Sequence, residues 1–321
     1  MKREIYVLCP AAFATGGPEA LHTLCLELRN QGQDAKMLYL NAREGQDPVA
    51  PRYRVYGLPY VTHAEDQEGM VVVVSEIDTY VLKKFPRARK AIWWLSVDNY
   101  FPKLQYFGPR SLADFLRREL GRFRDFGDPS VLHLCQSHYA LDFVRRKGVR
   151  NALLVMDYLG EEHLRGRFET SGREDVVLYN PSKGRPFTEK IMKALEGEVR
   201  FVALRGLSAA EVHDWCARAK VYIDFGHHPG KDRFPREAAM AGCVVVTSRR
   251  GSAAFHEDVP IPDAYKFVDA DENVAAIAAK IRDVLANYER RVDDFAGYRD
   301  FIREDRPRFV RQVRDLVARM G

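Results

Sequence analysis

Short apolar runs alternate with amphipathic stretches along the first half of the chain. Ile5–Cys9 is one such run, and Pro18–Gln31 follows it with apolar residues spaced three and four positions apart. A second run, Ala35–Leu40, comes directly afterwards. This pattern predicts a strand, a helix and a strand, the unit from which parallel sheets with right-handed crossovers are built. Further strands are predicted at Val71–Val74, Ala91–Leu95, Val131–Leu134 and Leu153–Met156.

The same alternation begins again in the second half. Val176–Tyr179 and Val199–Leu204 are predicted strands, with a helix at Phe187–Leu195 between them. The stretch Ser208–Glu211 has the spacing of a capping box, so it predicts the start of another helix. The remaining predicted strands are Val221–Phe225 and Val244–Thr247, and the remaining predicted helices are Pro235–Ala241, Asn273–Tyr288 and one or two within Ala296–Met320.

These elements predict two doubly wound α/β domains in tandem. The chain has 321 residues, more than one compact core usually organises. A polar, glycine-containing stretch at 159–175 marks the boundary. We therefore expect an N-terminal domain over 1–160, a second domain over 161–295 and a helical segment over 296–321 that can pack back on the first domain.

Composition narrows the class of protein. Apolar residues make up 46% of the chain and charged residues 30%, the balance of a globular protein. No apolar run approaches the ~20 residues that a membrane-spanning helix needs, and no segment of signal-peptide type precedes the first strand. We expect a cytoplasmic protein. Its five cysteines are scattered without a C-x-x-C pair, which favours buried free thiols over metal ligands or disulfides.

The charge of the chain suits an anionic ligand or an anionic membrane surface. The formal net charge is +5, and the sequence shows no motif for binding nucleic acid. The segment Phe301–Met320 carries six arginines and three acids around apolar positions at helical spacing. It is either an amphipathic helix packed on the body of the protein or a contact for lipid headgroups at the inner face of a membrane.

The loop after the strand Val221–Phe225 concentrates polar chemistry. Between Gly226 and Glu237 it contains glycines, two histidines and three cations, and a helix begins near its end. Backbone amides, the helix dipole and basic side chains together favour an anion there. Glu237 can accept two hydrogen bonds from a diol such as that of a ribose. A polar loop that ends in a capping glutamate is the alternative interpretation.

Three motifs occur in order along the chain. Gly16-Gly17 precedes a long predicted helix, a predicted strand leads to Lys183-Gly184, and the stretch from Glu237 to Val246 reads Glu-Ala-Ala-Met-Ala-Gly-Cys-Val-Val-Val. These motifs resemble, in the expected order, those of the GT-B glycosyltransferases, especially the bacterial enzymes of glycosyltransferase family 4, whose E-A-M-A-x-G segment is similar to the stretch that begins at Glu237. The resemblance implies a GT-B fold, in which two Rossmann-like domains face a cleft, and a hexosyltransferase-like activity.

The resemblance also implies roles for individual residues. Glu237 would bind the nucleotide ribose and Lys183 the diphosphate, while Gly16 and Gly17 would let the backbone approach the ligand. Arg233 is a second cation argued from its position in the loop alone. Asn180, His228, Gly230, Ser252 and Ala253 are the other expected donor-binding residues. Many family members carry a further glutamate eight positions before the one that matches Glu237, where this chain has Pro229.

We expect neither a metal nor another cofactor. Cationic side chains and helix amides can stabilise a departing nucleoside diphosphate in a GT-B enzyme without a metal. The D-x-D triplet Asp269-Ala270-Asp271 follows a predicted strand and precedes a helix. It fits turn and cap chemistry better than a manganese site.

The sequence offers three candidates for a general base and does not single out one of them. Asp98 follows the predicted strand Ala91–Leu95 at the position where a ligand-facing group is found, and His138 lies similarly after the strand Val131–Leu134. Glu19, in the first turn of the first helix, is the third candidate. Each of these residues can equally well be structural.

The sequence leaves three functions open. The first is a glycosyltransferase that acts on a nucleotide-sugar donor and a glycan or lipid-linked acceptor, as in polysaccharide biosynthesis. The second is a GT-B sugar-nucleotide epimerase, which needs no acceptor. The third is a non-catalytic nucleotide-sugar-binding protein of a polysaccharide assembly complex. A Rossmann dehydrogenase is disfavoured because Gly16-Gly17 lacks the spaced G-x-G-x-x-G pattern.

Overall fold

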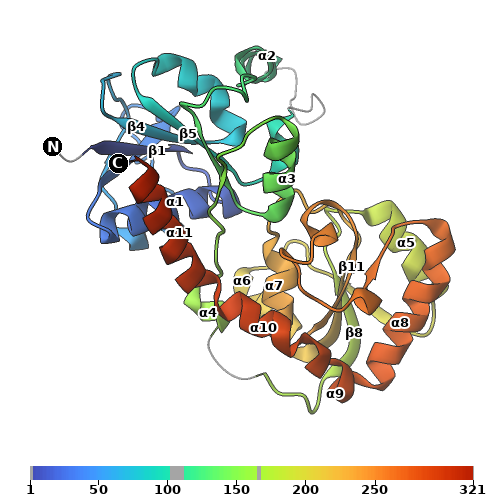
Figure 1. Cartoon of the computed structure of the whole chain (residues 1–321). Coiled ribbons are helices and arrows are strands. Elements are labelled where there is room, and N and C mark those ends of the chain that lie inside the picture. The colour runs from blue at the N-terminus through green and yellow to red at the C-terminus, as the bar shows by residue number, and fades with distance from the viewer. Residues whose placement is uncertain (1–2, 102–111, 165–167, 321) are drawn as a thin grey trace. The chain divides into compact units, whose positions relative to one another are not determined.

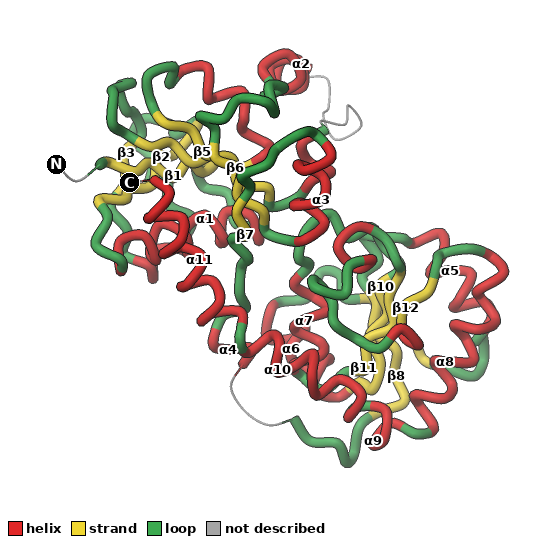
Figure 2. The backbone as a smooth tube through the Cα atoms, in the orientation of Figure 1, coloured by secondary structure: helices red, strands yellow, loops and turns green. Residues whose placement is uncertain are grey.

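The chain folds into two compact units. A computed structural model describes residues 3–101, 112–164 and 168–320. The first unit comprises Met1–Asp157 together with Pro307–Gly321, and the second comprises Tyr158–Arg306. Each unit is built on its own parallel sheet (Figure 2).

The first unit contains a seven-stranded sheet of order β3-β2-β1-β4-β5-β6-β7, in which all neighbours are parallel. The strands are β1 (Glu4–Pro10), β2 (Asp34–Leu40), β3 (Tyr60–Val61), β4 (Val71–Ser75), β5 (Arg89–Trp94), β6 (Leu132–Cys135) and β7 (Leu153–Leu154). The six strands predicted in this region are confirmed. Sequence periodicity missed β3, because Tyr60 and Val61 do not belong to a longer apolar run.

The strand order reverses between β1 and β4. From β1 the chain moves to β2 and β3 on one side, and then returns to place β4 to β7 on the other. At such a switch point the connections from two neighbouring strands run to opposite sides, so the loops after these strands move apart. Doubly wound sheets bind ligands at this place. The α-helices beside this sheet are α1 (Gly16–Asn30), α2 (Leu112–Gly121) and α3 (His138–Arg146), with 3-10 turns at Pro51–Tyr56, Glu76–Lys84 and Val97–Tyr100.

The C-terminal helix α11 (Asp305–Met320) packs on the first unit beside α1 (Figure 1). Gln31 at the end of α1 donates to the carbonyl of Val310, and the Phe309 ring stacks against Trp93 of β5. Phe309, Val313 and the other apolar residues of this face are buried. The arginine-rich segment is therefore an amphipathic helix packed on the protein, and its apolar side chains are not available to a lipid surface.

The second unit contains a five-stranded parallel sheet of order β12-β11-β10-β8-β9. Its strands are β8 (Glu174–Tyr179), β9 (Arg200–Ala203), β10 (Ala219–Asp224), β11 (Val244–Ser248) and β12 (Lys266–Phe267). The predicted strands are confirmed, and β12 is the strand that was predicted before the D-x-D triplet at 269–271. The order reverses between β8 and β10, so the switch point lies at their carboxyl ends.

The helices of the second unit begin close to where the sequence predicted. Ser208 caps α6 and forms the reciprocal capping box with Glu211, as its spacing indicated. The helices are α4 (Glu161–Leu164), α5 (Arg185–Ala194), α6 (Ala209–Arg218), α7 (Arg233–Met240), α8 (Val274–Ala286), α9 (Tyr288–Arg291) and α10 (Ala296–Arg303). Short 3-10 turns lie at Gly251–Ala254, Asp263–Tyr265, Asp271–Asn273 and Asp293–Phe295.

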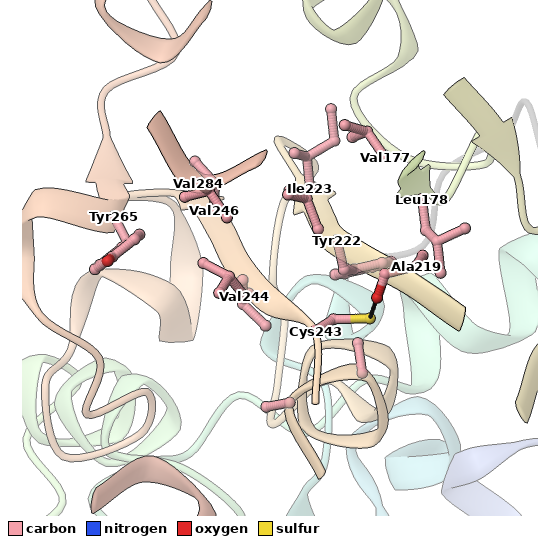
Figure 3. Packing of buried hydrophobic residues seen from close by; sticks show 14 of the residues in the cluster. Val177, Leu178, Ala219, Tyr222, Ile223, Cys243, Val244, Val246, Tyr265 and Val284 are labelled. Carbon is pink, nitrogen blue, oxygen red and sulfur yellow. Dashed lines mark hydrogen bonds between the residues drawn. The ribbon is translucent and has the colours of Figure 1, made fainter. Parts of the chain in front are cut away.

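Apolar strand residues form the core of the second unit (Figure 3). Tyr222 of β10 and Val244 of β11 are fully buried, and the thiol of Cys243 contacts the carbonyl of Ala219. All five cysteines of the protein are free and buried, as the sequence indicated. Within the described residues, no helix combines the length and the apolar character that crossing a membrane would require.

Candidate functional site

Three loops of the second unit leave neighbouring strands at the same edge of the sheet. Residues 180–184 follow β8, residues 225–232 follow β10, and residues 249–254 follow β11. Because β8, β10 and β11 are adjacent and parallel, these loops gather at the switch point (Figure 2). Most residues predicted to bind the donor therefore lie within one loop cluster.

Glycines allow these loops to approach one another. Gly184 has a φ of +58°, and a Cβ atom on it would lie 2.3 Å from the carbonyl oxygen of Phe225. Gly251 has a φ of +59°, and its Cβ would lie 1.9 Å from the carbonyl oxygen of His228. A side chain at either position would be both strained and obstructed. The backbone that carries Lys183 is thus fixed against the loop that carries His228.

Lys183 makes an ion pair with Asp232 across two of these loops. The Lys183 Nζ lies 2.5 Å from Oδ2 of Asp232, and the lysine side chain keeps 32% of its surface exposed. Asp232 is the N-cap residue of α7, a position where aspartate usually accepts hydrogen bonds from the helix amides. Its side chain makes no such bond here. The carboxylate is directed to Lys183 instead.

His228 lies beneath this pair, almost fully buried between two carboxylates. Its Nδ1 is 3.3 Å from Oδ2 of Asp232, and its Nε2 is 3.5 Å from Oδ1 of Asp224 and 3.2 Å from Oγ1 of Thr247. The Thr247 hydroxyl donates to the Asp224 carbonyl, so it is an acceptor toward the ring. Both ring nitrogens therefore face acceptors, which is the environment of a protonated imidazole.

The charges around His228 agree with this geometry. Burial lowers the pKa of His228, but Asp224 and Asp232 together outweigh it, so the pKa is raised above its ordinary value. Burial raises the pKa of Asp224, and the neighbouring His228 and Lys183 reverse this, so that pKa is lowered. The four side chains form a charge-balanced network, with two cations and two anions.

Glu237 lies in the second turn of α7, because the helix begins at Arg233 rather than at Pro235. Its Oε1 accepts from Nε of Arg233 at 3.1 Å and lies 3.6 Å from Nε2 of His163. The carboxylate keeps 14% of its surface exposed and Arg233 keeps 25%. Both predicted donor-binding residues are therefore within reach of a ligand on this side of the helix.

Two other cations of the loop make buried ion pairs. Lys231 Nζ lies 2.6 Å from Oδ1 of Asp305, and Arg236 lies 3.4 Å from Oδ2 of the same carboxylate. Arg236 also donates to the backbone carbonyls of Lys231 and Asp232. From the sequence, we expected all three cations of this loop to be available to an anion. In the structure, Lys231 and Arg236 support the loop from the interior, and only Arg233 among the three is partly exposed.

The remaining expected donor-binding residues shape the loops. Asn180 accepts from the amide of Ser182 and forms the turn before Lys183. The Ser252 hydroxyl donates to the carbonyl of Gly230 at 2.6 Å, and Ala253 is buried in the hydrophobic core. Their side chains thus hold the backbone in place, and direct contact with a donor stays a prediction for them.

Metal-type ligand atoms come together at one place among the described residues. Asp224, His228 and Asp232 offer ligand atoms within 4.8 Å of one another. The Lys183 ammonium already supplies positive charge to this group, and His228 faces acceptors on both sides. The D-x-D triplet is engaged elsewhere, since Asp269 pairs with Arg250 and Asp271 with Lys190.

The first unit holds the other predicted residues. Gly16 and Gly17 open α1 after the loop that follows β1, and a Cβ on Gly17 would meet only Leu95 Cδ1 at an ordinary 3.9 Å. Neither strain nor packing within the described chain therefore requires glycine at position 17. Glu19 pairs with Arg52 at 2.8 Å, which favours a structural role for that carboxylate.

Asp98 and His138 follow adjacent strands, β5 and β6. Tyr139, next to His138 at the start of α3, donates from its hydroxyl to Oδ1 of Asp98 at 3.4 Å. The structure therefore brings these two candidates into one region, while Glu19 lies beyond β4 in the strand order. Both Asp98 and His138 are only partly buried.

Sequence reasoning missed two groups of ionisable residues. Asp224 and Asp232 were not singled out, although an aspartate before a helix that opens Arg-Phe-Pro-Arg is a visible N-cap signal. Glu76 directly follows β4 at the switch point of the first sheet, and its Oε2 accepts from the Leu95 amide at 2.8 Å. It is 2% exposed. No pattern in the sequence distinguished it from a surface glutamate.

Comparison with solved structures identifies the architecture. Sucrose-phosphate synthase from Thermosynechococcus elongatus superposes with a TM-score of 0.65 at 11% identity, over 99% of each chain. HepE of Anabaena, in a complex with UDP-glucose, matches with a TM-score of 0.61 at 10% identity over 98% of this chain and 99% of that one. The chain has a GT-B fold.

The GT-B fold alone does not decide the activity. The N-terminal domain of trehalose-6-phosphate phosphatase from Candida albicans also matches, with a TM-score of 0.60 at 9% identity over 100% of this chain and 97% of that domain. No family model matches the sequence, and neither does any curated protein. The function must therefore be argued from the residues of the site.

Proposed function

We propose that this protein is a glycosyltransferase that moves a sugar from a nucleoside-diphosphate sugar to a glycan or lipid-linked acceptor without a metal ion. The observation that carries the proposal is the loop cluster at the switch point between β8 and β10. The cluster presents Lys183, and helix α7, which begins where its second loop ends, presents Arg233 and Glu237; all three side chains are partly exposed. Two cations suit a diphosphate, and a carboxylate suits the hydroxyls of a ribose.

The GT-B neighbours support the same chemistry. HepE was solved with UDP-glucose, with UDP and glucose, and with UDP, and a further neighbour is an α-glucosyltransferase in complex with UDP. We infer that the second unit of this chain binds such a donor. The first unit would supply the acceptor-side groups, with Asp98 as the first candidate for the general base.

The charges of the proposed donor site support the proposal of metal independence. A departing diphosphate needs positive charge, which Lys183, Arg233 and the amides at the start of α7 can supply. Together with Lys183, the Asp224, His228 and Asp232 group has two cations and two anions, so its charge balance does not depend on a divalent ion. We also propose that the protein acts in the cytoplasm, where nucleotide sugars are available. Peripheral contact with an anionic membrane would use exposed arginines of α11 rather than its apolar face.

The decisive experiment has two stages. Thermal unfolding is measured with UDP, GDP, CMP and dTDP sugars, and the donor that stabilises the protein is then incubated with and without glycan and lipid-linked acceptors. Transfer that needs an acceptor and survives EDTA is the expected result. Turnover of the donor without any acceptor would indicate an epimerase or hydrolase, and binding without turnover would indicate a non-catalytic protein. Loss of transfer in EDTA, restored by manganese or magnesium, would overturn metal independence.

A further inference from the structure

The Lys183 ammonium already has an anionic partner at the place where the proposed function needs a diphosphate. Asp232 lies 2.5 Å from it and is 16% exposed. A diphosphate brings at least two negative charges, and like charges close to a single ammonium repel one another. The aspartate and the ligand therefore compete for the single positive charge of Lys183.

Asp232 has a second partner within reach. The oxygen that contacts Lys183, Oδ2, is also 3.3 Å from Nδ1 of His228. The opposite nitrogen of that ring is held by Asp224 and Thr247, so His228 is oriented with one N–H toward Asp232. Because Oδ2 already lies beside His228, Asp232 keeps a cationic partner when a ligand takes the lysine.

The side chain of Asp232 is not tied to its own helix. As the N-cap of α7 it makes no side-chain capping bond, although aspartate is among the best residues for this purpose. Arg236 instead donates to the backbone carbonyl of Asp232 and fixes the main chain. The main chain of Asp232 is therefore fixed, while no capping hydrogen bond restrains its carboxylate. A side chain in this situation can change its partner.

We propose that Asp232 is a positioning residue of the donor site: it holds Lys183 in the empty protein and passes to His228 when a diphosphate takes the lysine. This inference rests on the proposed function, because it assumes that Lys183 meets the donor diphosphate. Asp232 keeps the lysine extended toward the ligand, and it also competes with the ligand. The affinity for a diphosphate is thus set by an exchange of anions rather than by the lysine alone.

Removing the charge of Asp232 should strengthen binding. Inorganic pyrophosphate is the probe, because it tests the diphosphate contact without assuming a base or a sugar. Asp232→Asn should bind it about tenfold more tightly than wild type, since one charge-assisted bond no longer has to be broken. Asp232→Glu keeps the charge and should stay near the wild-type affinity. Asp175→Asn, an exposed aspartate at the amino end of β8, is the matched control and should change nothing.

The role of His228 is tested by a double-mutant cycle with the same probe. His228→Gln should weaken pyrophosphate binding several-fold when Asp232 is present, because the displaced carboxylate loses its charged partner. It should have little effect in the Asp232→Asn background. Isothermal titration gives the affinities, and thermal unfolding verifies that each variant is folded.

The possible results separate the two proposals. If wild type binds neither pyrophosphate nor any nucleoside diphosphate, the proposed function fails. If wild type binds and Lys183→Met abolishes binding, but Asp232→Asn binds equally or more weakly, the exchange of anions is refuted while the proposed function stands. A purely structural Asp232 would give weaker binding on substitution, the opposite sign to the one expected here. Equal effects of His228→Gln in both backgrounds would remove His228 from the exchange.

Discussion

The Lys231 ammonium and the Asp305 carboxylate meet at 2.6 Å inside the second unit, where at most 1% of either side chain is exposed. Arg236 reaches the other oxygen of the same carboxylate at 3.4 Å. One acid, at the first residue of α11, therefore pairs with two buried cations, Lys231 and Arg236. The loop that carries His228 and Asp232 is thus supported by a residue more than seventy positions away in the sequence.

Asp305→Ala should strongly destabilise the second unit. Two buried cations would lose their partner, and breaking a buried pair in this way typically costs about 3–5 kcal/mol. Urea unfolding measures the loss. Asp300→Ala removes an exposed acid that pairs with Arg303, so it should cost less than about 1 kcal/mol. Equal effects of the two substitutions would contradict the supporting role of Asp305.

Glu237→Gln should weaken nucleoside diphosphates selectively. The carboxylate is expected to accept ribose hydroxyls, and charge-assisted bonds of this kind contribute about 1.5–3 kcal/mol, or tenfold and more in affinity. Pyrophosphate has no ribose, so its binding should fall little. Isothermal titration with UDP, GDP and pyrophosphate distinguishes the contacts. Glu189→Gln, which alters an exposed pair with Arg185, serves as the control. Parallel loss for both kinds of ligand would assign Glu237 to the loop structure instead.

Asp98→Asn should depress transfer far more than donor affinity. The substitution keeps the size of the side chain and its contact with Tyr139 but removes its basicity, and general-base assistance is typically worth ~10²–10⁴-fold. Transfer rate and donor binding are measured on the same preparation, with Asp142→Asn of α3 as the control. Near-normal transfer would exclude Asp98. His138 would then be the next residue to test, ahead of Glu19, whose carboxylate is occupied by Arg52.

Glu76→Gln should change how stability depends on pH. Burial raises the pKa of Glu76 from 4.5 to about 8, against the opposing effect of the backbone amides of Leu95 and Ser96. Between these values the folded state holds a proton that the unfolded state releases. The free energy of unfolding of wild type should therefore fall as pH rises through this window and level off above it.

The glutamine variant lacks this proton. As pH rises from about 5 to about 8.5, the free energy of unfolding of the variant should therefore increase relative to that of wild type, by an amount on the order of a few kcal/mol. Urea unfolding at several pH values measures both proteins, and Glu119→Gln, in α2 and partly exposed, controls for a simple change of charge. A constant difference between the glutamine variant and wild type across the range would show that Glu76 titrates normally.

The sequence determined the elements and their order. Hydrophobic periodicity located the longer strands, and the Ser208 capping box fixed the start of α6, because these features depend on neighbours within a few residues. Motif order was enough to name the GT-B fold and to nominate Lys183 and Glu237, and position in the loop nominated Arg233. The short strand β3 and the 3-10 turns left no such local signal.

Only the tertiary structure decided how each polar side chain is used. Lys231, Arg233 and Arg236 look equivalent along the chain, yet two of them are buried against Asp305 and one faces outward. The pairing of Asp232 with both Lys183 and His228 depends on the loops after β8 and β10 being brought together by sheet order. Burial and ion pairing are set by residues distant in sequence, and those contacts exist only once the parallel sheet has formed.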